Sequence, residues 1–143
     1  LARKKALAAA GRFPGAFVIG SDTSAALDGK TLGKPHGLED FMDFFPKLSG
    51  RVHTVVTAVA LVSPGGEITE RICSVDVEMA AFTADDALRY WRTGEPADKA
   101  AGYAVQGIGA RFIRKIDGSP TALVGLPLPE TAELLAGAGF FDA

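Results

Sequence analysis

The sequence predicts a mixed α/β fold, with a partly antiparallel sheet flanked by helices, on three observations. Residues 51–62 and 67–79 are long runs rich in β-branched residues that a Pro-Gly-Gly turn separates, which predicts a long antiparallel hairpin. Asp28-Gly29 is a strong two-residue signal for a second, shorter hairpin. Apolar residues at helical spacing occur between these hairpins, over 38–48. This order argues against a doubly wound parallel sheet.

The individual elements follow from apolar spacing and from the positions of glycine, proline and capping residues. In chain order they are a helix at 1–10, a strand at 17–19, a short hairpin of 25–27 with 30–32, a helix at 38–48, the long hairpin of 51–62 with 67–79, a helix at 83–94, a strand at 110–116, an apolar run at 122–126 and a helix at 128–135. Pro46 is expected to end or kink its helix at Phe45. Thr83 is expected to cap the helix that follows it.

Asp22 is the carboxylate around which a candidate site is organised. It follows Phe17-Val18-Ile19, the pattern of a strand covered on both faces, and Gly20, which allows a turn or a close approach. Ligands bind at the C-terminal ends of strands in open α/β sheets, so a carboxylate there is suited to hold a divalent cation or to accept a proton from water. The alternative is an ordinary turn aspartate that bonds its own backbone.

Length, charge and cysteine content limit the classes of protein to which the sequence can belong. A length of 143 residues indicates one domain, and a net charge of -2 argues against a general nucleic-acid coat, although a local lysine cluster still suits a small anion. Cys73 is the single cysteine, which excludes an internal disulfide and fits a reducing compartment. With no signal peptide and no apolar run near the roughly 20 residues of a membrane span, we expect a soluble cytoplasmic protein without a membrane partner.

The beginning of the sequence is unusual. It opens on strong helix formers with neither a methionine nor a capping residue before them. We therefore expect that an N-terminal segment of the natural protein is missing from this sequence.

No familiar catalytic constellation is evident from spacing. His36 and His53 are far apart in sequence, so each is expected to be structural, and the glycines of 102–109 lack the lysine and serine of a phosphate loop. The remaining candidates are charged or amide residues on loops or element ends: Lys5, Asp22, Lys34, Asp98, Lys99 and Gln106. Lysines beside a carboxylate suit phosphate-ester chemistry, and an amide is able to read a base edge. The alternative is a solvated polar surface.

Short blocks of the sequence, taken together in order, resemble a known family. They are Leu1-Ala-Arg-Lys-Lys5-Ala6, Gly20-Ser-Asp22-Thr23, Leu27-Asp-Gly29, Leu32-Gly-Lys34-Pro35, Leu48-Ser-Gly50 with His53 and Thr57, Gly94-Glu-Pro96 with Asp98-Lys99-Ala100, Tyr103-Ala-Val-Gln106-Gly107, and Val124-Gly-Leu-Pro-Leu128. Over essentially the whole chain they are similar to the Maf family, the septum-formation-inhibitor proteins that act as nucleoside triphosphate pyrophosphatases.

The resemblance implies a single Maf-like domain over 1–143 with a central cleft, as in inosine-triphosphatase-like proteins, and a cytoplasmic homodimer that uses a divalent metal, Mg²⁺ or Mn²⁺. Asp22 would be the catalytic general base or the metal ligand. Lys5 and Lys34 would hold phosphates, and Gln106 would help to recognise the base. The block with Asp98 and Lys99 and the Gln106 block resemble the subgroup acting on dTTP and UTP rather than the one preferring methylated GTP.

Three departures and two alternatives accompany this resemblance. Ser21 replaces the commoner alanine, and Pro120 stands where the dTTP/UTP subgroup usually has an aromatic residue. The family's opening strand and Ser-x-Ser-x-Arg-Arg motif are missing, so this chain by itself is expected to be weakly active or inactive. One alternative is a non-catalytic nucleotide- or partner-binding protein in cell-division control, and retention of the lysines with Asp22 favours the enzyme over it. The other is an inosine-triphosphate type of pyrophosphatase, against which the Gln106 block argues.

Overall fold

The computed structural model describes residues 1–142, which form two compact units. Unit 1 comprises Leu1–Thr23, Val56–Ser74 and the described residues from Ser119 onward. Unit 2 comprises Ser24–Val55 and Val75–Gly118. The expectation of a single domain over 1–143 stays a prediction.

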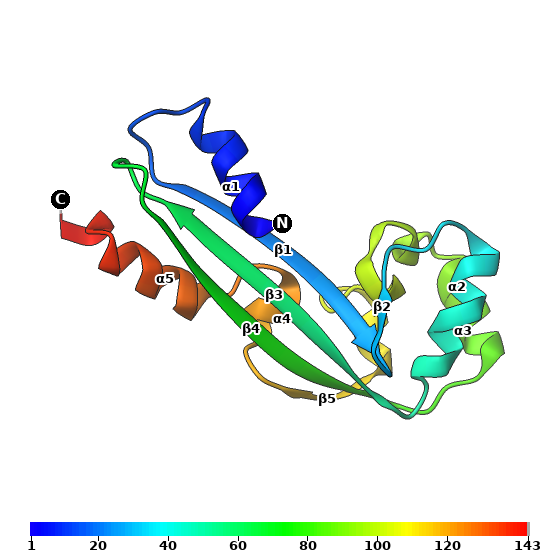
Figure 1. Ribbon diagram of the computed structural model, residues 1–143. Coiled ribbons are helices and arrows are strands. Elements are labelled where there is room, and N and C mark those ends of the chain that lie inside the picture. Colours follow the sequence, from blue (N-terminus) through cyan, green and yellow to red (C-terminus); the bar gives the residue numbers. More distant parts are fainter. Residues whose placement is uncertain (143) are drawn as a thin grey trace. The chain divides into compact units, whose positions relative to one another are not determined.

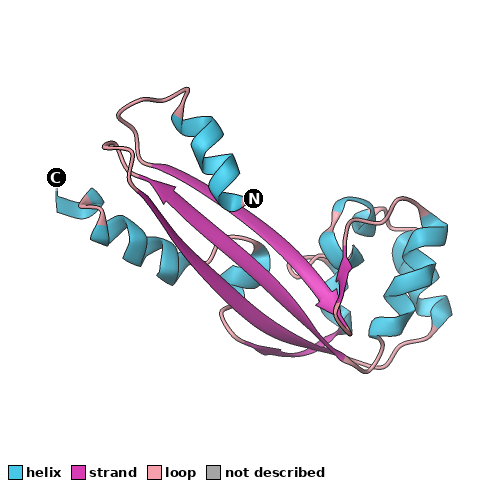
Figure 2. Cartoon of the chain, viewed as in Figure 1, coloured by secondary structure: helices cyan, strands magenta, loops and turns pink. Residues whose placement is uncertain are grey.

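A five-stranded antiparallel sheet runs through the chain, which confirms the α/β class (Figure 2). The strands lie in the order β2-β1-β3-β4-β5. Their bounds are Val18–Leu27 for β1, Lys30–Leu32 for β2, Val52–Val62 for β3, Ile68–Met79 for β4 and Ile113–Asp117 for β5. Both predicted hairpins are therefore confirmed, and β1, β3 and β4 each contribute residues to both units.

Residues 1–142 contain five α-helices (Figure 1). They are α1 (Ala2–Ala10), α2 (Leu38–Phe44), α3 (Ala84–Trp91), α4 (Pro120–Val124) and α5 (Leu128–Gly137). Short 3-10 helices lie at Phe45–Leu48, Glu95–Asp98, Ala100–Gly102, Ile108–Phe112 and Phe140–Asp142. Within residues 1–142, no helix combines the length and the apolar character that crossing a membrane requires.

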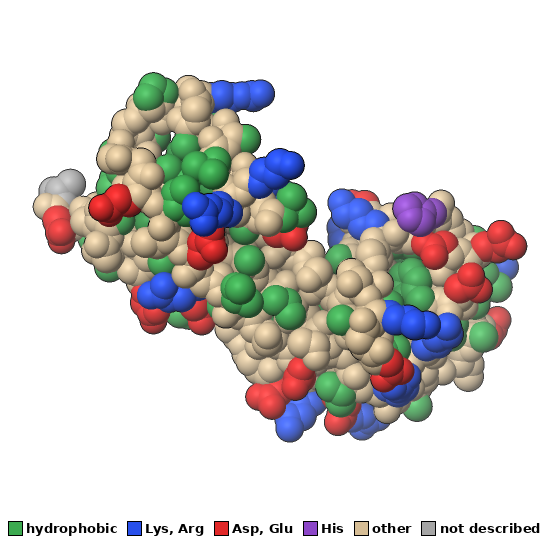
Figure 3. Space-filling model, viewed as in Figure 1, with side chains coloured by type: hydrophobic (Ala, Val, Ile, Leu, Met, Phe, Trp, Pro, Cys, Tyr) green, Lys and Arg blue, Asp and Glu red, His purple; other side chains and the backbone are tan. Residues whose placement is uncertain are grey.

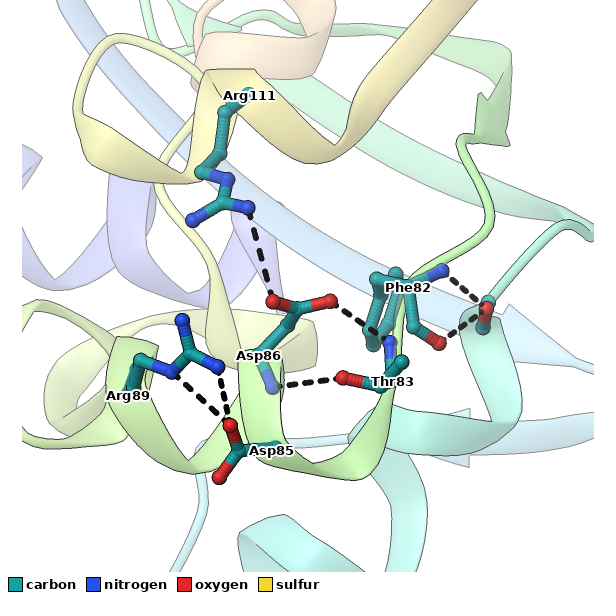
Figure 4. Close-up of polar contacts among 7 residues, drawn as sticks. Phe82, Thr83, Asp85, Asp86, Arg89 and Arg111 are labelled. Atoms are coloured by element: carbon teal, nitrogen blue, oxygen red, sulfur yellow. Dashed lines mark hydrogen bonds and ion pairs between the residues drawn. The ribbon is translucent and has the colours of Figure 1, made fainter.

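Two residues expected to end or begin a helix, Pro46 and Thr83, do so. Helix α2 ends at Phe44, and Pro46 lies in the 3-10 turn that follows. At the start of α3 the Thr83 hydroxyl accepts a hydrogen bond from the Asp86 N–H at 3.1 Å, and the Asp86 carboxylate accepts one from the Thr83 N–H at 2.9 Å (Figure 4). This capping box confirms the predicted helix start.

The short hairpin turns at the predicted dipeptide. Leu27 and Lys30 are partners in the β1–β2 ladder, so Asp28 and Gly29 form a two-residue turn. Their φ angles are 51° and 78°, both positive. A type I′ turn needs positive φ at both central residues, and its twist matches that of the flanking strands.

The predicted end of the first strand is wrong. We expected a strand at 17–19 followed by a turn carrying Asp22, but β1 continues without a break from Val18 to Leu27. Val18 is buried and Ile19 is exposed, so the strand is covered on one face here rather than on both. Gly20 supplies room for the close approach of α1 instead of a turn. Asp22 therefore lies within a strand and not at its C-terminal end.

One element near the C-terminus also differs from expectation. The strand expected at 110–116 begins only at Ile113, because a 3-10 helix occupies Ile108–Phe112. The apolar run at 122–126, for which the sequence indicates no particular element, contributes Ala122, Leu123 and Val124 to α4, whose first residue is Pro120. Proline is favoured at the first helical position, where its fixed φ suits a helix and its missing N–H costs nothing. Gly125, at a φ of 125°, then ends this helix.

Unit 1 has a core on each face of the sheet. Ala60 and Val62 of β3 are buried in a cluster with the small residues of α1. Val59 and Leu61 point to the opposite face and pack against Leu134 of α5. Since successive side chains of a strand alternate between faces, this run of four buried residues indicates that helices cover both faces of β3. Figure 1 shows α1 and α5 on opposite sides of the strands.

Gly20 is the position where α1 and β1 come closest. A Cβ there would lie 2.5 Å from the Ala2 carbonyl oxygen and 2.7 Å from the Ala6 nitrogen. Both are backbone atoms that are unable to rotate away, so Gly20→Ala is expected to lower the free energy of unfolding by about 2 to 3 kcal/mol. Urea denaturation measures this change. Gly33→Ala, where nothing lies within 4 Å, serves as the control, and equal stability of the two variants would contradict the packing.

Unit 2 has a core of aromatic residues. Phe41 and Phe45 from the α2 region are both fully buried and stack with ring centroids 4.6 Å apart. Phe112 meets Phe45 edge to face at 5.6 Å, and Tyr90 of α3 lies 5.2 Å from Phe112. Aromatic pairs at such separations add stability beyond their buried area. This cluster fixes α2 and α3 together.

His53 is buried beside the same aromatic core. Its Nε2 lies 2.6 Å from the Tyr103 hydroxyl, and its Nδ1 has no hydrogen-bond partner within residues 1–142. Burial lowers the pKa of His53 from an ordinary 6.5 to about 4, against the weaker opposing effect of the Asp76 charge. The imidazole is therefore neutral in the folded protein at pH 7, and the expectation of a structural role for His53 fits this environment.

The lowered pKa of His53 predicts a specific loss of stability in acid. In the unfolded chain this histidine is protonated below about pH 6.5, whereas in the folded chain it is protonated only below about pH 4. The free energy of unfolding therefore falls as the pH falls from 6.5 to 4. The expected loss is up to about 3 kcal/mol. Urea denaturation at pH 7 and pH 4.5 measures it. His53→Gln should lose that part of the pH dependence, whereas the exposed control His36→Gln should retain it; identical profiles for both variants would contradict the assignment.

Candidate functional site

Lys5 and Asp22 form an ion pair in unit 1. The Lys5 ammonium donates to the Asp22 carboxylate at 3.0 Å and to the Ser21 carbonyl at 3.3 Å. The side chains are 52% and 31% exposed, so the carboxylate and the ammonium are both accessible to a ligand. The structure thus brings together two of the residues that the sequence singled out, one on α1 and one on β1.

Packing of α1 on β1 positions this pair. Ala2 and Ala6 are buried against the sheet, and Gly20 allows their backbone to approach. Lys5 precedes Ala6 on the helix, at the margin of this contact, where its side chain reaches Asp22 two residues after Gly20. A small residue on each element therefore sets the separation at which the ammonium and the carboxylate meet.

A buried threonine, Thr57, and the half-buried Thr23 hold β1 next to Asp22. The Thr57 hydroxyl donates to the Ala122 carbonyl at 2.7 Å, and the Thr23 and Thr57 hydroxyl oxygens are 2.9 Å apart. Because Thr57 uses its only proton on Ala122, Thr23 must be the donor to Thr57. Thr57 lies in one of the sequence blocks that carry the family resemblance, but the sequence alone indicates no role for it, because a threonine inside a strand has no distinctive pattern.

Lys34, Asp98 and Lys99 lie in unit 2. The Lys99 ammonium donates to the Asp98 carboxylate at 3.0 Å. The pKa of Asp98 is lowered by this hydrogen bond and by the positive charges of Lys99 and Lys34. The Ala101 N–H donates to the Gly33 carbonyl at 3.3 Å, which ties the two loops that carry these residues. The structure therefore gathers two cations and one carboxylate as the sequence suggested.

Gln106 also lies in unit 2, exposed on the loop between Tyr103 and the 3-10 helix at Ile108–Phe112. The Glu95 carboxylate accepts hydrogen bonds from the backbone N–H groups of Ile108 and Gly109, each at 2.8 Å. Tyr90 donates its hydroxyl proton to the same carboxylate. The roles of Glu95 and Tyr90 were not predicted from the sequence. The sequence does contain a signal for them: a glutamate between Gly94 and Pro96, and the closely spaced Gly107 and Gly109, which allow a loop to approach a carboxylate.

The candidate residues thus fall into two groups, one in each unit. Lys5 and Asp22 belong to unit 1, whereas Lys34, Asp98, Lys99 and Gln106 belong to unit 2. In the view of Figure 3, lysine and arginine side chains lie beside acidic ones on each unit. Each group combines a carboxylate with at least one cation, the composition that an anionic ligand with a bound cation requires.

The donor set bears on how a metal ion is bound. Residues 1–142 contain no group of three or more histidine, cysteine, aspartate or glutamate side chains arranged to hold a metal. Zinc and calcium sites built from side chains need several such donors, but Mg²⁺ is commonly held by one or two carboxylates together with substrate phosphates and water. The single Asp22 carboxylate fits the second arrangement, in which a phosphate ligand supplies the remaining oxygens.

Comparison with known proteins gives a consistent result. The family described as Maf-like protein matches residues 1–138. A dTTP/UTP pyrophosphatase of Colwellia psychrerythraea is 48% identical over 124 residues, which are 87% of this chain and 58% of the relative. The protein of that name from Shewanella denitrificans is 45% identical over 91% of this chain and 65% of its own length, and one from Acinetobacter baylyi is 43% identical over 94% and 73%. The chain thus spans somewhat over half to about three quarters of these relatives.

Fold and site together define an α/β protein with an antiparallel sheet and with paired lysine and aspartate side chains suited to an anionic ligand. The family model matches residues 1–138, nearly the whole chain, and so identifies one family within this class. The chain belongs to the Maf family.

Proposed function

We propose that the protein hydrolyses nucleoside triphosphates to the monophosphate and pyrophosphate. The observation that carries this proposal is the accessible pair of Lys5 and Asp22, joined at 3.0 Å on elements whose close packing fixes their separation. The relatives named dTTP/UTP pyrophosphatase at 43 to 48% identity support it. In unit 2, Lys99 pairs with Asp98 at 3.0 Å, and the resemblance to the Maf family assigns this block to the substrate.

In this reaction a water molecule attacks the α-phosphorus. The bond from that phosphorus to the oxygen that bridges it to the β-phosphorus breaks, and pyrophosphate leaves. Asp22 either accepts the proton of the attacking water or holds the metal ion, the two roles open to a carboxylate here. Lys5 orients the Asp22 carboxylate through their hydrogen bond. The resemblance to the Maf family assigns phosphate binding to Lys5 and to Lys34, and an ammonium group there would offset the negative charge that grows on phosphate oxygens during the reaction.

The cofactor of this proposal is a divalent cation, Mg²⁺ or Mn²⁺. Asp22 would hold it together with the substrate's phosphates, in keeping with the absence from residues 1–142 of any group of three or more side-chain ligands for a metal. When bound, such an ion screens phosphate charge and makes a coordinated water more acidic.

The proposed substrates are dTTP and UTP. Uracil and thymine share an edge with one N–H donor and flanking carbonyl acceptors, and the exposed amide of Gln106 carries both an acceptor and donors. The names of the relatives point to the same two nucleotides. A cytoplasmic location and a homodimer rest on the resemblance to the family alone and stay predictions.

The test is pyrophosphate release from a panel of purine and pyrimidine nucleoside triphosphates with Mg²⁺ or Mn²⁺. It uses this chain and any longer chain that its reading frame encodes. Release that requires the metal and is fastest with dTTP or UTP is the expected result. A folded protein that binds nucleotides but releases pyrophosphate from none of them would overturn the proposal in favour of a non-catalytic nucleotide-binding protein.

A further inference from the structure

The Glu95 carboxylate is engaged by three donors of the protein itself. Its Oε1 accepts the Ile108 N–H, and its Oε2 accepts the Gly109 N–H and the Tyr90 hydroxyl proton. Both backbone donors belong to the segment that directly follows Gln106. A carboxylate bound in this way has little capacity left for a substrate, so its role differs from that of Asp22 or Asp98.

Tyr90 extends this network to the other end of the loop. Its hydroxyl oxygen accepts the Ala104 N–H at 3.1 Å while its proton goes to Glu95. Tyr90 is itself buried in the aromatic core of unit 2, which fixes its ring. The loop is thus held on both sides of Gln106, at Ala104 before it and at Ile108 and Gly109 after it.

Two glycines let the loop approach this closely. A Cβ on Gly107 would collide with the Glu95 carboxylate, and a Cβ on Gly109 would lie 2.8 Å from the Ala104 carbonyl oxygen as well as against the Tyr90 hydroxyl. Gly107 and Gly109 flank Ile108, whose N–H is one of the bound donors. The glycine-rich segment is therefore explained by contact with Glu95 and Tyr90, without the phosphate-loop role that its sequence loosely suggests.

The charge state of Glu95 agrees with these contacts. Desolvation acts to raise the pKa of the Glu95 carboxyl, but the hydrogen bonds from Tyr90, Gly109 and Ile108 outweigh it, and the pKa lies below its ordinary value. Burial, together with the hydrogen bond to Glu95, raises the pKa of Tyr90. Near neutral pH the tyrosine is therefore the donor and the carboxylate the acceptor, and the network keeps one hydrogen-bond direction.

We propose that Glu95 is a positioning residue that, with Tyr90, holds the loop 104–109 in the conformation that presents Gln106 to the nucleobase. The inference rests on the proposed function and deepens it. Gln106 is exposed, and the backbone on either side of it is held by hydrogen bonds at Ala104, Ile108 and Gly109, so its placement depends on the backbone of its loop. Glu95 thereby contributes to the choice between bases without touching the substrate.

The test compares Glu95→Gln with the exposed control Glu39→Gln in the same unit. Glutamine keeps the size of the side chain but turns an NH₂ group toward backbone and hydroxyl donors, so one or more of the three hydrogen bonds is lost. The principal readout is the ratio of kcat/KM for dTTP to kcat/KM for dGTP. A partial loss of folded protein lowers both values equally and leaves this ratio unchanged.

Glu95→Gln is expected to lower the ratio about tenfold, mainly through a higher KM for dTTP. Amide exchange at Ile108 and Gly109 should become about tenfold faster, a readout that needs no activity. Glu39→Gln should change neither quantity. In the double variant Glu95→Gln with Gln106→Ala, the ratio should equal that of Gln106→Ala alone, because both changes remove the same base contact.

Two results would overturn this inference while leaving the proposed function intact. One is an unchanged ratio in Glu95→Gln despite faster amide exchange at the loop. The other is a double variant whose ratio falls by the product of the two single effects, which would mean that Glu95 acts independently of Gln106. If the unaltered protein releases pyrophosphate from no nucleotide, the proposed function itself fails, and this role of Glu95 fails with it.

Discussion

Asp22→Asn is expected to lower kcat for pyrophosphate release by at least about a thousandfold. Asparagine has the same shape as aspartate and is able to accept a hydrogen bond from Lys5, so the packing of α1 on β1 should persist. It lacks the negative charge needed to take a proton from water or to hold a divalent cation. The loss should therefore appear in kcat, measured with dTTP or UTP at saturating Mg²⁺.

Stability separates a chemical effect from unfolding in this experiment. The ion pair of Lys5 and Asp22 is partly exposed, so its loss should cost less than about 1 kcal/mol of unfolding free energy. Asp43→Asn, at an exposed position of α2, should leave kcat unchanged. A folded Asp22→Asn variant with near-normal kcat would remove Asp22 from the mechanism.

Phe45→Ala is expected to cost about 3 to 5 kcal/mol of unfolding free energy, the largest stability effect that we predict. Phe45 is fully buried, and its ring meets those of Phe41 at 4.6 Å, Phe82 at 5.1 Å and Phe112 at 5.6 Å. These neighbours come from separate segments of unit 2 and are unable to collapse fully into the space left by the ring. Urea denaturation followed by circular dichroism measures the change.

Phe13→Ala is the matched control for that substitution. Phe13 is 61% exposed, so removing its ring should change the unfolding free energy by less than about 1 kcal/mol. Similar stabilities for Phe45→Ala and Phe13→Ala would mean that the aromatic cluster does not form the core of unit 2. A midpoint for Phe45→Ala far below that of the unaltered protein, with Phe13→Ala unchanged, is the outcome that the packing requires.

Features set by local chemistry were predictable from the sequence. The Asp28-Gly29 turn needs positive φ at both residues, and few other dipeptides supply it. Thr83 caps α3 through a hydroxyl and an acidic partner three residues apart, a pattern that is legible in the chain itself. Pro46 ends α2 because its ring clashes with the preceding turn of a helix and leaves it no N–H to donate. In each case the interacting groups are within a few residues of one another.

Features that depend on distant segments were not predictable in the same way. Polar residues after Gly20 suggested a turn, but β1 continues because its neighbours in the sheet supply hydrogen-bond partners and α1 fills the space above the glycine. Thr57 supports β1 through Thr23 and Ala122, which are far from it in sequence. Glu95 is explained only by a loop more than ten residues away. Residue type and spacing do not carry such information.

Residue type and expected position singled out the candidate site residues, but the role of each one came from the resemblance to the Maf family. Composition and pattern alone left Lys5, Asp22 and the loop residues compatible with a solvated surface. The structure adds that Lys5 contacts Asp22 and that Lys99 contacts Asp98. The catalytic and substrate-binding roles of these residues stay predictions, of which Asp22→Asn tests the role of Asp22 and Gln106→Ala tests that of Gln106.

The most direct test of the central proposal is product analysis by ³¹P NMR after incubation of the protein with UTP and Mg²⁺. Attack at the α-phosphorus predicts UMP and pyrophosphate as the only initial products, in equal amounts, and none of either with Asp22→Asn. UDP and orthophosphate as the initial products would place the attack at the γ-phosphorus and contradict the proposal. So would UTP that stays intact in the presence of the folded protein.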